Sequence, residues 1–273
     1  MQTLQVNGTT IAYGDSGSPP DRPDAPTIVF GHGLLFSGWM FQAQVAAFRG
    51  RYRCVTLDWR GHGSTPATTG SYDMDTLTDD AVGVINGLDV APVHYVGLSM
   101  GGFVGQRIAA RHGELLRSLT LLDTSPDPEE PAAARQDKIL ALAYRVVGMK
   151  PLMSKVAPLM FGPTFLADPN SKPVMDEFVQ RLGHCDRGGM RKAVLAVANR
   201  DPIYDEIDRI TAPTLVIVGA DDTPTPPAKA RRIAERVPGA QLEIVPNCGH
   251  SSTVEQPKAI TELLRHFLAT VDA

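Results

Sequence analysis

The sequence predicts an α/β fold in which a mostly parallel β-sheet is covered by helices on both faces. Short runs of β-branched and aliphatic residues recur along the chain, and they are apolar on both faces rather than at alternate positions. Parallel strands that are buried between helices have this pattern. Amphipathic stretches with helical spacing separate the runs, and such an alternation of strand and helix is typical of parallel sheets.

The expected elements follow one another from the N-terminus. Residues 4–6 and 10–13 flank Asn7-Gly8, a dipeptide that favours a tight hairpin turn. Further strands are expected at residues 27–30, 54–57, 93–98, 119–122, 214–218 and 241–245. Helices are expected at residues 38–48, 74–88, 102–112, 228–237 and 257–268.

One long segment departs from this alternation. Residues 126–205 are rich in Pro, Met and Ala, have helical spacing and show little β signal. We therefore expect a helical cap, or lid, at residues 126–205, inserted into a core domain made of residues 1–125 and 206–273.

Composition excludes several classes of protein. The chain has 273 residues with 26 Lys and Arg against 30 Asp and Glu, a net charge of −4, so we expect neither a nucleic acid nor a membrane as partner. Cys54, Cys185 and Cys248 cannot all pair with one another, and no two of them form CxxC. These cysteines predict free thiols in a cytoplasmic protein without a metal site. No N-terminal signal pattern and no apolar run of about 18 residues is found.

The strongest chemical signal is the pentapeptide Gly97-Leu98-Ser99-Met100-Gly101, which fits the pattern G-x-S-x-G between a predicted strand and a predicted helix. A nucleophilic serine in this context occupies a sharp, strained turn, and the glycines allow close backbone approach. The N-terminus of the following helix directs its free N–H groups towards the site. We predict Ser99 as the nucleophile; the alternative is a surface serine in a Gly-rich turn.

A serine hydroxyl needs a base to accept its proton. Among seven histidines, His250 lies in a loop between the last predicted strand and the last predicted helix, from which it can reach the edge of the sheet. His32 and His62 are flanked by glycines, and for them a loop-bracing hydrogen bond is the preferred interpretation. We predict His250 as the general base.

The base in turn needs a carboxylate that fixes its tautomer. Asp222 follows the predicted strand 214–218 through Gly-Ala-Asp, and the chain order Ser, Asp, His is then satisfied. Asp221, directly before it, and Asp123, at the end of strand 119–122, are the two competing candidates.

Two backbone N–H groups are expected to stabilise the oxyanion that forms during acyl transfer. One is that of Met100, directly after the nucleophile, and the other is that of Leu34, in the Gly-rich loop after strand 27–30, with Leu35 as the near alternative.

Taken together, these motifs resemble the α/β-hydrolase superfamily, and within it the small bacterial esterases, enol-lactone hydrolases and cofactor-free haloperoxidase-like enzymes. The resemblance covers nearly the whole chain and rests on five motifs, Phe30-Gly31-His32-Gly33, Asp58-Trp59-Arg60-Gly61-His62-Gly63, Gly97-Leu98-Ser99-Met100-Gly101-Gly102, Gly219-Ala220-Asp221-Asp222 and Gly249-His250. It implies the α/β-hydrolase fold with an eight-stranded, mostly parallel sheet and a helical cap. It also implies the triad Ser99, Asp222 and His250 and oxyanion donors at Leu34 and Met100. The second motif departs from the family pattern D-x-R-G-x-G-x-S because Thr65 follows Ser64, so a local difference in this turn is expected.

The expected function is a serine hydrolase that cleaves carboxylic esters of small to medium apolar substrates through an acyl-enzyme, without a cofactor or metal. The alternatives are an enol-lactone hydrolase of the 3-oxoadipate enol-lactone type, a C–C bond hydrolase, a perhydrolase or haloperoxidase-like enzyme, and a non-catalytic binding protein on this fold. The expected partner is a small ester or lactone, and the chain is expected to be a monomer or a homodimer.

Residues of the substrate pocket are expected near the oxyanion loop and on the inner face of the cap, although apolar residues at helical spacing also occur in plain cores. The candidates are Leu35, Phe36, Trp39, Met149, Met153, Met160, Phe161 and Phe165.

Overall fold

The computed structural model describes all residues from Met1 to Ala273, and its centre is one sheet of eight strands. The strands are β1 (Gln2–Val6), β2 (Thr9–Asp15), β3 (Thr27–Gly31), β4 (Arg53–Leu57), β5 (Val93–Leu98), β6 (Leu116–Leu122), β7 (Thr214–Gly219) and β8 (Gln241–Val245). Their order is β1-β2-β4-β3-β5-β6-β7-β8. β1 and β2 form an antiparallel hairpin, β2 is antiparallel to β4, and all later neighbours are parallel. The mostly parallel eight-stranded sheet expected from the sequence is confirmed.

Helices connect the strands. The α-helices are α1 (Gln42–Phe48), α2 (Met74–Gly87), α3 (Met100–Arg111), α4 (Pro131–Val147), α5 (Met153–Met160), α6 (Pro163–Ala167), α7 (Lys172–His184), α8 (Arg187–Ala198), α9 (Pro227–Arg236), α10 (Ser252–Glu255) and α11 (Pro257–Val271). Short 3₁₀ helices are η1 (Gly38–Phe41), η2 (Gly113–Leu115), η3 (Lys150–Leu152), η4 (Pro169–Ser171) and η5 (Ile207–Arg209). The single helix expected at residues 38–48 is thus divided into η1 and α1.

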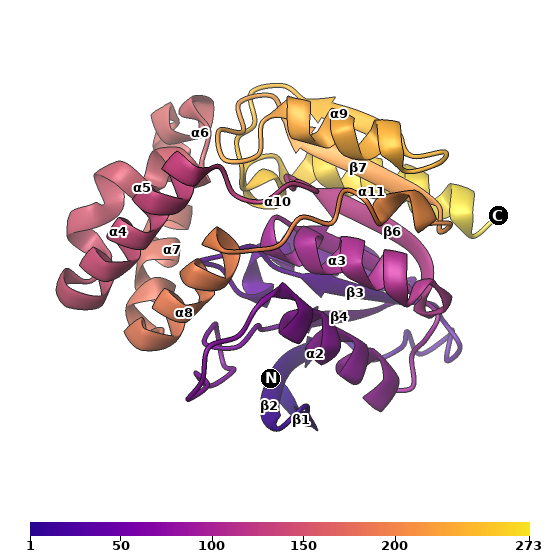
Figure 1. The fold of residues 1–273 in the computed structure, drawn as a ribbon. Coiled ribbons are helices and arrows are strands. Elements are labelled where there is room, and N and C mark those ends of the chain that lie inside the picture. Colours follow the sequence, from indigo (N-terminus) through magenta and orange to yellow (C-terminus); the bar gives the residue numbers. More distant parts are fainter.

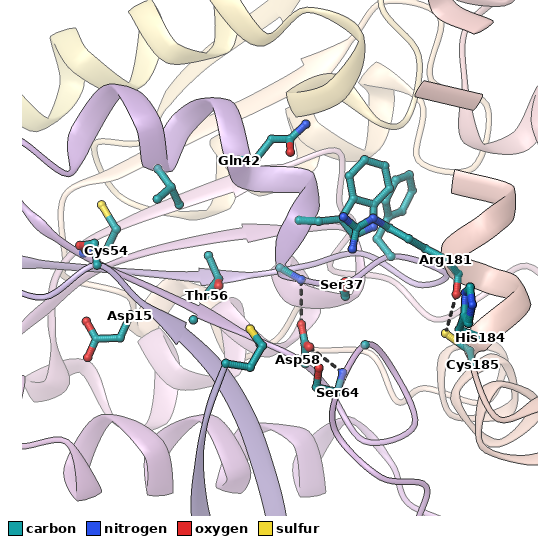
Figure 2. A pocket seen from close by; sticks show the side chains of 18 of the residues that line it. Asp15, Ser37, Gln42, Cys54, Thr56, Asp58, Ser64, Arg181, His184 and Cys185 are labelled. Carbon is teal, nitrogen blue, oxygen red and sulfur yellow. Dashed lines mark hydrogen bonds between the residues drawn. The ribbon is translucent and has the colours of Figure 1, made fainter. Parts of the chain in front are cut away.

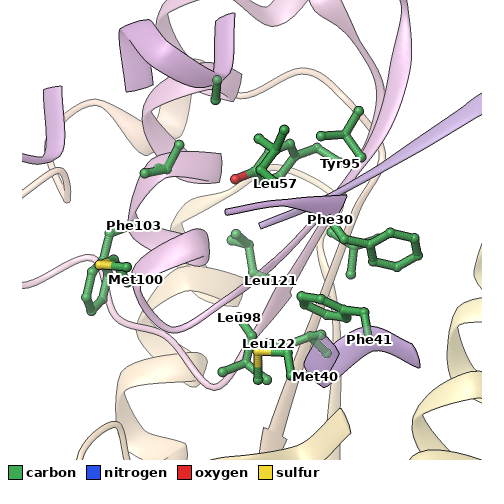
Figure 3. Packing of buried hydrophobic residues seen from close by; sticks show 14 of the residues in the cluster. Phe30, Met40, Phe41, Leu57, Tyr95, Leu98, Met100, Phe103, Leu121 and Leu122 are labelled. Carbon is green, nitrogen blue, oxygen red and sulfur yellow. The ribbon is translucent and has the colours of Figure 1, made fainter. Parts of the chain in front are cut away.

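The helices form layers on the two faces of the sheet (Figure 1). α2 packs against α3 on one face, and α1 packs against α11 on the other. Between sheet and helices the side chains are apolar and closely packed, as the rings of Phe30 and Phe41 show with centroids 4.9 Å apart (Figure 3). This core fixes the C-terminal ends of β3 and β5. The Gly-rich loop follows β3, and Ser99 follows β5.

Between β6 and β7 the chain forms only helices, from α4 to α8. These five helices lie together beyond one end of the sheet (Figure 1). The division into a core and a cap at residues 125 and 206 stays a prediction, but the helical character expected of this segment agrees with the structure. No helix in the chain is both long and apolar enough to span a membrane.

Candidate active site

Ser99 stands on the sharp turn between β5 and α3. Its φ of 51° and ψ of −110° are values that a non-glycine residue adopts only when the surroundings impose them. A Cβ on Gly97 would overlap the carbonyl of Gly101, so the sequence can form this turn only with glycine there. The serine is 7% exposed, and it opens into a pocket.

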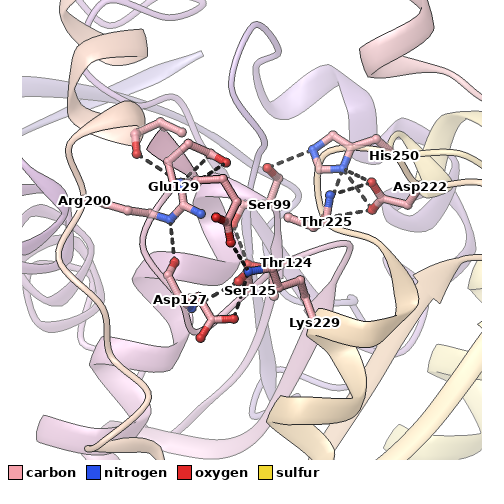
Figure 4. Close-up of polar contacts among 12 residues, drawn as sticks. Ser99, Thr124, Ser125, Asp127, Glu129, Arg200, Asp222, Thr225, Lys229 and His250 are labelled. Carbon is pink, nitrogen blue, oxygen red and sulfur yellow. Dashed lines mark hydrogen bonds and ion pairs between the residues drawn. The ribbon is translucent and has the colours of Figure 1, made fainter. Parts of the chain in front are cut away.

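A continuous chain of hydrogen bonds starts at this serine (Figure 4). The Ser99 hydroxyl lies 2.9 Å from Nε2 of His250. On the other side of the ring, Nδ1 of His250 lies 3.0 Å from each carboxylate oxygen of Asp222. The structure therefore brings together in one hydrogen-bonded chain the three side chains that the sequence predicts as nucleophile, base and acid.

Asp222 is held in turn by Thr225, whose part in the site the sequence analysis missed. The backbone N–H of Thr225 donates to Oδ1 of Asp222 at 2.9 Å, and its hydroxyl donates to Oδ2 at 2.8 Å. A hydroxyl residue three positions after an aspartate is a known turn signal, and it could have identified Thr225.

The two competing acids lie elsewhere. Asp221 is exposed. Asp123 is fully buried, and its Oδ1 accepts a hydrogen bond from the Gly219 N–H at 2.8 Å, but its Oδ2 has no partner and neither oxygen bonds to His250. Burial, reinforced by the charge of Asp222, raises the pKa of Asp123 well above its ordinary value.

The histidines divide clearly by environment. Burial lowers the pKa of His250, but the charge and hydrogen bond of Asp222, together with Asp123 and Glu255, outweigh it, and the pKa lies above its ordinary value. His32 and His62 are fully buried, and burial lowers the pKa of each to about 3. His32 accepts a hydrogen bond from the Trp59 N–H at 3.0 Å, so it braces a loop, as expected.

The loop that carries His250 is anchored by Glu255, a second residue that the sequence analysis missed. Its Oε1 accepts the N–H of Ser251 at 3.0 Å, and its Oε2 accepts the N–H of Gly249 at 2.8 Å. The same Oε2 also accepts the N–H of Gly162, between α5 and α6, at 2.9 Å. One buried carboxylate thus joins the His250 loop to the helical segment between β6 and β7.

The turn after β4, where the sequence departs from the family pattern, is closed by Thr65. Its hydroxyl donates to the backbone carbonyl of Asp58 at 2.6 Å and accepts the N–H of Ala12 at 2.8 Å. The carboxylate of Asp58 accepts the N–H groups of Gly38 and Ser64, each at 2.8 Å. The threonine thereby ties the turn to β2.

The residues expected to supply the oxyanion donors lie beside the serine. Met100 is the first residue of α3, and Leu34 lines the same pocket as Ser99. Leu35, the near alternative, has a φ of 69°, so the loop turns sharply directly after Leu34. The role of the two N–H groups stays a prediction.

Ser99 and His250 face a cavity of about 120 Å³, and 14 of its 20 lining residues are hydrophobic. Of the expected pocket residues, Leu35, Met149 and Met160 line it. The lining residues that were not expected come mostly from α4, α5 and α8: Phe103, Glu129, Asp137, Leu140, Ala141, Tyr144, Leu152, Val156, Leu159, Met190, Val194, Val197, Pro224 and Thr225.

The other five expected pocket residues do not line this cavity: Phe36, Trp39, Met153, Phe161 and Phe165. Phe36 and Phe161 pack with Phe178 of α7, with ring centroids 4.9 and 5.3 Å from it, and Phe165 stacks on Phe161 at 5.2 Å. This aromatic cluster joins the segment after β3 to α5, α6 and α7, so these rings contact one another rather than the cavity beside Ser99.

Trp39 lines a different hollow, an open groove of about 570 Å³ (Figure 2). Arg181 lies over its ring at 5.2 Å from the centroid. The groove shares only Leu35 with the cavity beside Ser99.

The chain has no group of three or more His, Cys, Asp or Glu side chains placed to bind a metal ion, and its cysteines are free thiols.

Comparison with known proteins agrees with this fold. Over 257 residues the chain is 29% identical to 3-oxoadipate enol-lactonase 2 of Acinetobacter baylyi, covering 94% of this chain and 92% of the relative. A thermophilic esterase from Thermogutta terrifontis has the same fold with a TM-score of 0.90 and 26% identity, covering 100% of both chains. An enol-lactonase from Burkholderia xenovorans matches with a TM-score of 0.90 and 29% identity, covering 98% of this chain and 100% of the other. The model of the alpha/beta hydrolase family matches residues 28–263. The chain therefore belongs to the alpha/beta hydrolase family.

Proposed function

We propose that the protein is a carboxylic ester hydrolase that uses Ser99, His250 and Asp222 in a two-step acyl transfer. The observation that carries this proposal is the continuous hydrogen-bonded chain from the Ser99 hydroxyl through His250 to Asp222, at the wall of an apolar cavity. A free hydroxyl is a weak nucleophile, and a hydrogen-bonded imidazole with a buried carboxylate behind it is the arrangement that activates one.

In the first step His250 accepts the proton of Ser99 as the hydroxyl attacks the ester carbonyl. Asp222 keeps the proton of the ring on Nδ1, so that Nε2 is free to act as base. The N–H groups of Leu34 and Met100 stabilise the negative oxygen of the tetrahedral intermediate. His250 then protonates the leaving alcohol, and in the second step it activates a water that releases the acid.

The cavity supports small to medium apolar acyl groups as substrates. It is modest in size, and aliphatic and Met side chains dominate its lining. Methionine adapts to irregular apolar shapes, so Met149, Met160 and Met190 suit acyl chains of varied form.

Hydrolysis of an enol-lactone is the second candidate, and the similarity over nearly full length to two enol-lactonases favours it. Both reactions use the same acyl chemistry, so a substrate panel separates them. The panel consists of 4-nitrophenyl acetate, butyrate, octanoate and palmitate with a carboxylated enol-lactone. A preference of more than about 100-fold in kcat/KM for the enol-lactone, worth ~2.7 kcal/mol of transition-state binding, would favour the second candidate.

The role of Ser99 is tested with a fluorophosphonate, which labels an activated serine, and with the variant Ser99→Ala. We expect labelling of the wild type, no labelling of the variant, and a loss of kcat on the order of 10⁵–10⁶ with an unchanged circular dichroism spectrum. The matched control is Ser71→Ala, which removes an exposed hydroxyl of the loop before α2. More than a few per cent of activity in a clean preparation of Ser99→Ala would remove Ser99 from the mechanism.

A further inference from the structure

The cavity beside Ser99 is lined in part by acidic side chains that have no role in the proposed acyl transfer. Its lining contains two carboxylates, Glu129 and Asp137, and no Lys or Arg side chain. Glu129 precedes α4, and Asp137 lies within that helix.

Asp137 belongs to the inward face of α4. Ala134, Ala141 and Tyr144 of the same face are buried, and the spacing of three and seven residues places Asp137 among them. Asp137 itself is half-buried, and an apolar residue would be expected at this position, because partial removal of a charge from water without a partner is costly. A carboxylate here is therefore unexplained by packing.

The two carboxylates differ in their partners. Glu129 accepts a hydrogen bond from Nη1 of Arg200 at 2.7 Å (Figure 4). The Arg200 guanidinium also lies 4.2 Å from the ring centroid of Phe103. This arginine is buried, and it is held further by the Asp127 carbonyl, which accepts from Nε at 3.1 Å, and by the Val197 carbonyl, which accepts from Nη1 at 3.1 Å. Asp137 has no hydrogen-bond or ion-pair partner. The negative charge of Glu129 is thus balanced by Arg200, while that of Asp137 is left facing the cavity.

We propose that Asp137 is a charge-selectivity residue, which makes this cavity discriminate against acyl groups that carry a carboxylate and favour neutral or ammonium-bearing ones. The inference rests on the proposed function, since it takes the cavity to be the acyl site of Ser99. A substrate carboxylate in the cavity would meet a like charge and no unpaired cation, which disfavours binding, whereas an ammonium group would gain an ion pair.

Protonation of Asp137 gives the proposal a second signature. Burial raises the pKa of Asp137 to about 6, Glu129 adds to the rise, and Arg200 opposes it. The charges that act on Asp137 are those of Glu129 before α4 and Arg200 after α8, and the other titratable groups that line the same cavity are Tyr144 on its own helix and His250. Below pH 6 Asp137 becomes neutral, so discrimination against anions weakens.

The experiment compares three 4-nitrophenyl esters of similar length: the neutral pentanoate, the anionic hemiglutarate and the cationic 4-(trimethylammonio)butyrate. They share one leaving group and one kind of reacting carbonyl, so ratios of kcat/KM isolate the effect of charge. Partial loss of folded enzyme in a variant, and protonation of His250 at low pH, affect all three esters alike and cancel in the ratio.

We expect the wild type to hydrolyse the hemiglutarate at least about tenfold less efficiently than the pentanoate, a difference of ~1.4 kcal/mol, and the cationic ester at least as well as the pentanoate. Asp137→Asn should raise the hemiglutarate-to-pentanoate ratio about tenfold. The matched control Asp176→Asn, which removes an exposed charge on α7, should leave the ratio unchanged. Lowering the pH from 7.5 to 5.5 should raise the ratio in the wild type and not in Asp137→Asn.

Two results would overturn the inference while leaving the proposed function intact. One is a wild type that hydrolyses the pentanoate but prefers the hemiglutarate, and the other is an Asp137→Asn variant with the same ratio as Asp176→Asn. Failure of the wild type to hydrolyse any of the three esters would contradict the proposed function instead. The charge preference would then be read from the labelling rates of fluorophosphonates with neutral and carboxylated tails, and equal rates would refute it.

Discussion

Replacing Asp222 by asparagine tests the proposed mechanism most directly. The Thr225 N–H is a fixed donor to Oδ1, so the amide oxygen of the asparagine must take that position. The amide NH₂ then takes the position of Oδ2, 3.0 Å from Nδ1 of His250, and donates towards the ring. Oδ1 and Oδ2 both lie 3.0 Å from Nδ1, so the variant replaces one of two acceptors with a donor. Donation by the NH₂ favours the tautomer with its proton on Nε2, which faces Ser99 and cannot accept the serine proton. We expect kcat to fall by about 10³–10⁴, equivalent to ~4–5.5 kcal/mol of transition-state stabilisation.

The assay is steady-state hydrolysis of 4-nitrophenyl butyrate from pH 5 to 9. In the wild type the base must be neutral, and its pKa is raised by Asp222, so kcat/KM should fall as the pH drops through an apparent pKa above that of an ordinary histidine. Without the charge of Asp222, burial dominates, and the acidic limb of the profile should move to lower pH in Asp222→Asn. The control is Asp221→Asn, which changes the adjacent, exposed carboxylate. A variant Asp222→Asn that keeps a tenth of kcat, or an acidic limb that stays in place, would refute this reasoning.

Two further predictions concern the carboxylates around the site. Asp123→Asn should lower kcat far less than Asp222→Asn, because the raised pKa favours the neutral acid that asparagine resembles, and the oxygen that accepts the Gly219 N–H is retained. The same ester assay checks this, and a greater loss than in Asp222→Asn would make Asp123 the acid of the triad. Glu255→Gln should reduce the free energy of unfolding by about 1–3 kcal/mol, since three buried N–H groups share its two oxygens and an amide leaves at least one of them unpaired. Urea denaturation measures it against the exposed control Glu262→Gln, and equal midpoints for the two variants would contradict the expectation.

Much of the fold could be predicted because the buried parallel strands leave a strong local signal. The ends of β5 and β8 coincide with the expected ranges, and the hairpin forms at Asn7-Gly8, whose φ values of 45° and 70° suit the tight turn. The position of β4 between β2 and β3 carries no such signal, since the order of strands depends on contacts between distant segments.

The residues of the site also fall into those that leave a local signal in the sequence and those that do not. Ser99, Asp222 and His250 could be nominated because each follows a strand and belongs to a motif whose chemistry restricts the residue type. Glu255 could not, because it acts through backbone groups that its own neighbours in the sequence do not reveal.

The predicted pocket residues that lie away from the cavity have a related explanation. In the sequence Phe36 and Phe161 have the same apolar character whether their rings line a cavity or pack against other rings. Only their rings' contacts with Phe178 decide between the two. Asp137 was missed for the opposite reason, because a charged residue in a helix is ordinarily assigned to the surface.

The shared carboxylate of Glu255 also bears on how this scaffold can be re-engineered. Exchanging the helices between β6 and β7 for those of a relative is an obvious way to alter selectivity. The transplanted segment must, however, present a free N–H where Gly162 now lies, close against Gly249. A graft with a side chain at that position would press on the loop of His250 and impair catalysis even when the new cavity is well shaped. Chimaeras that keep residues 160–163 of this chain should therefore retain turnover more often than chimaeras in which the whole segment between the end of β6 and the start of β7 is replaced.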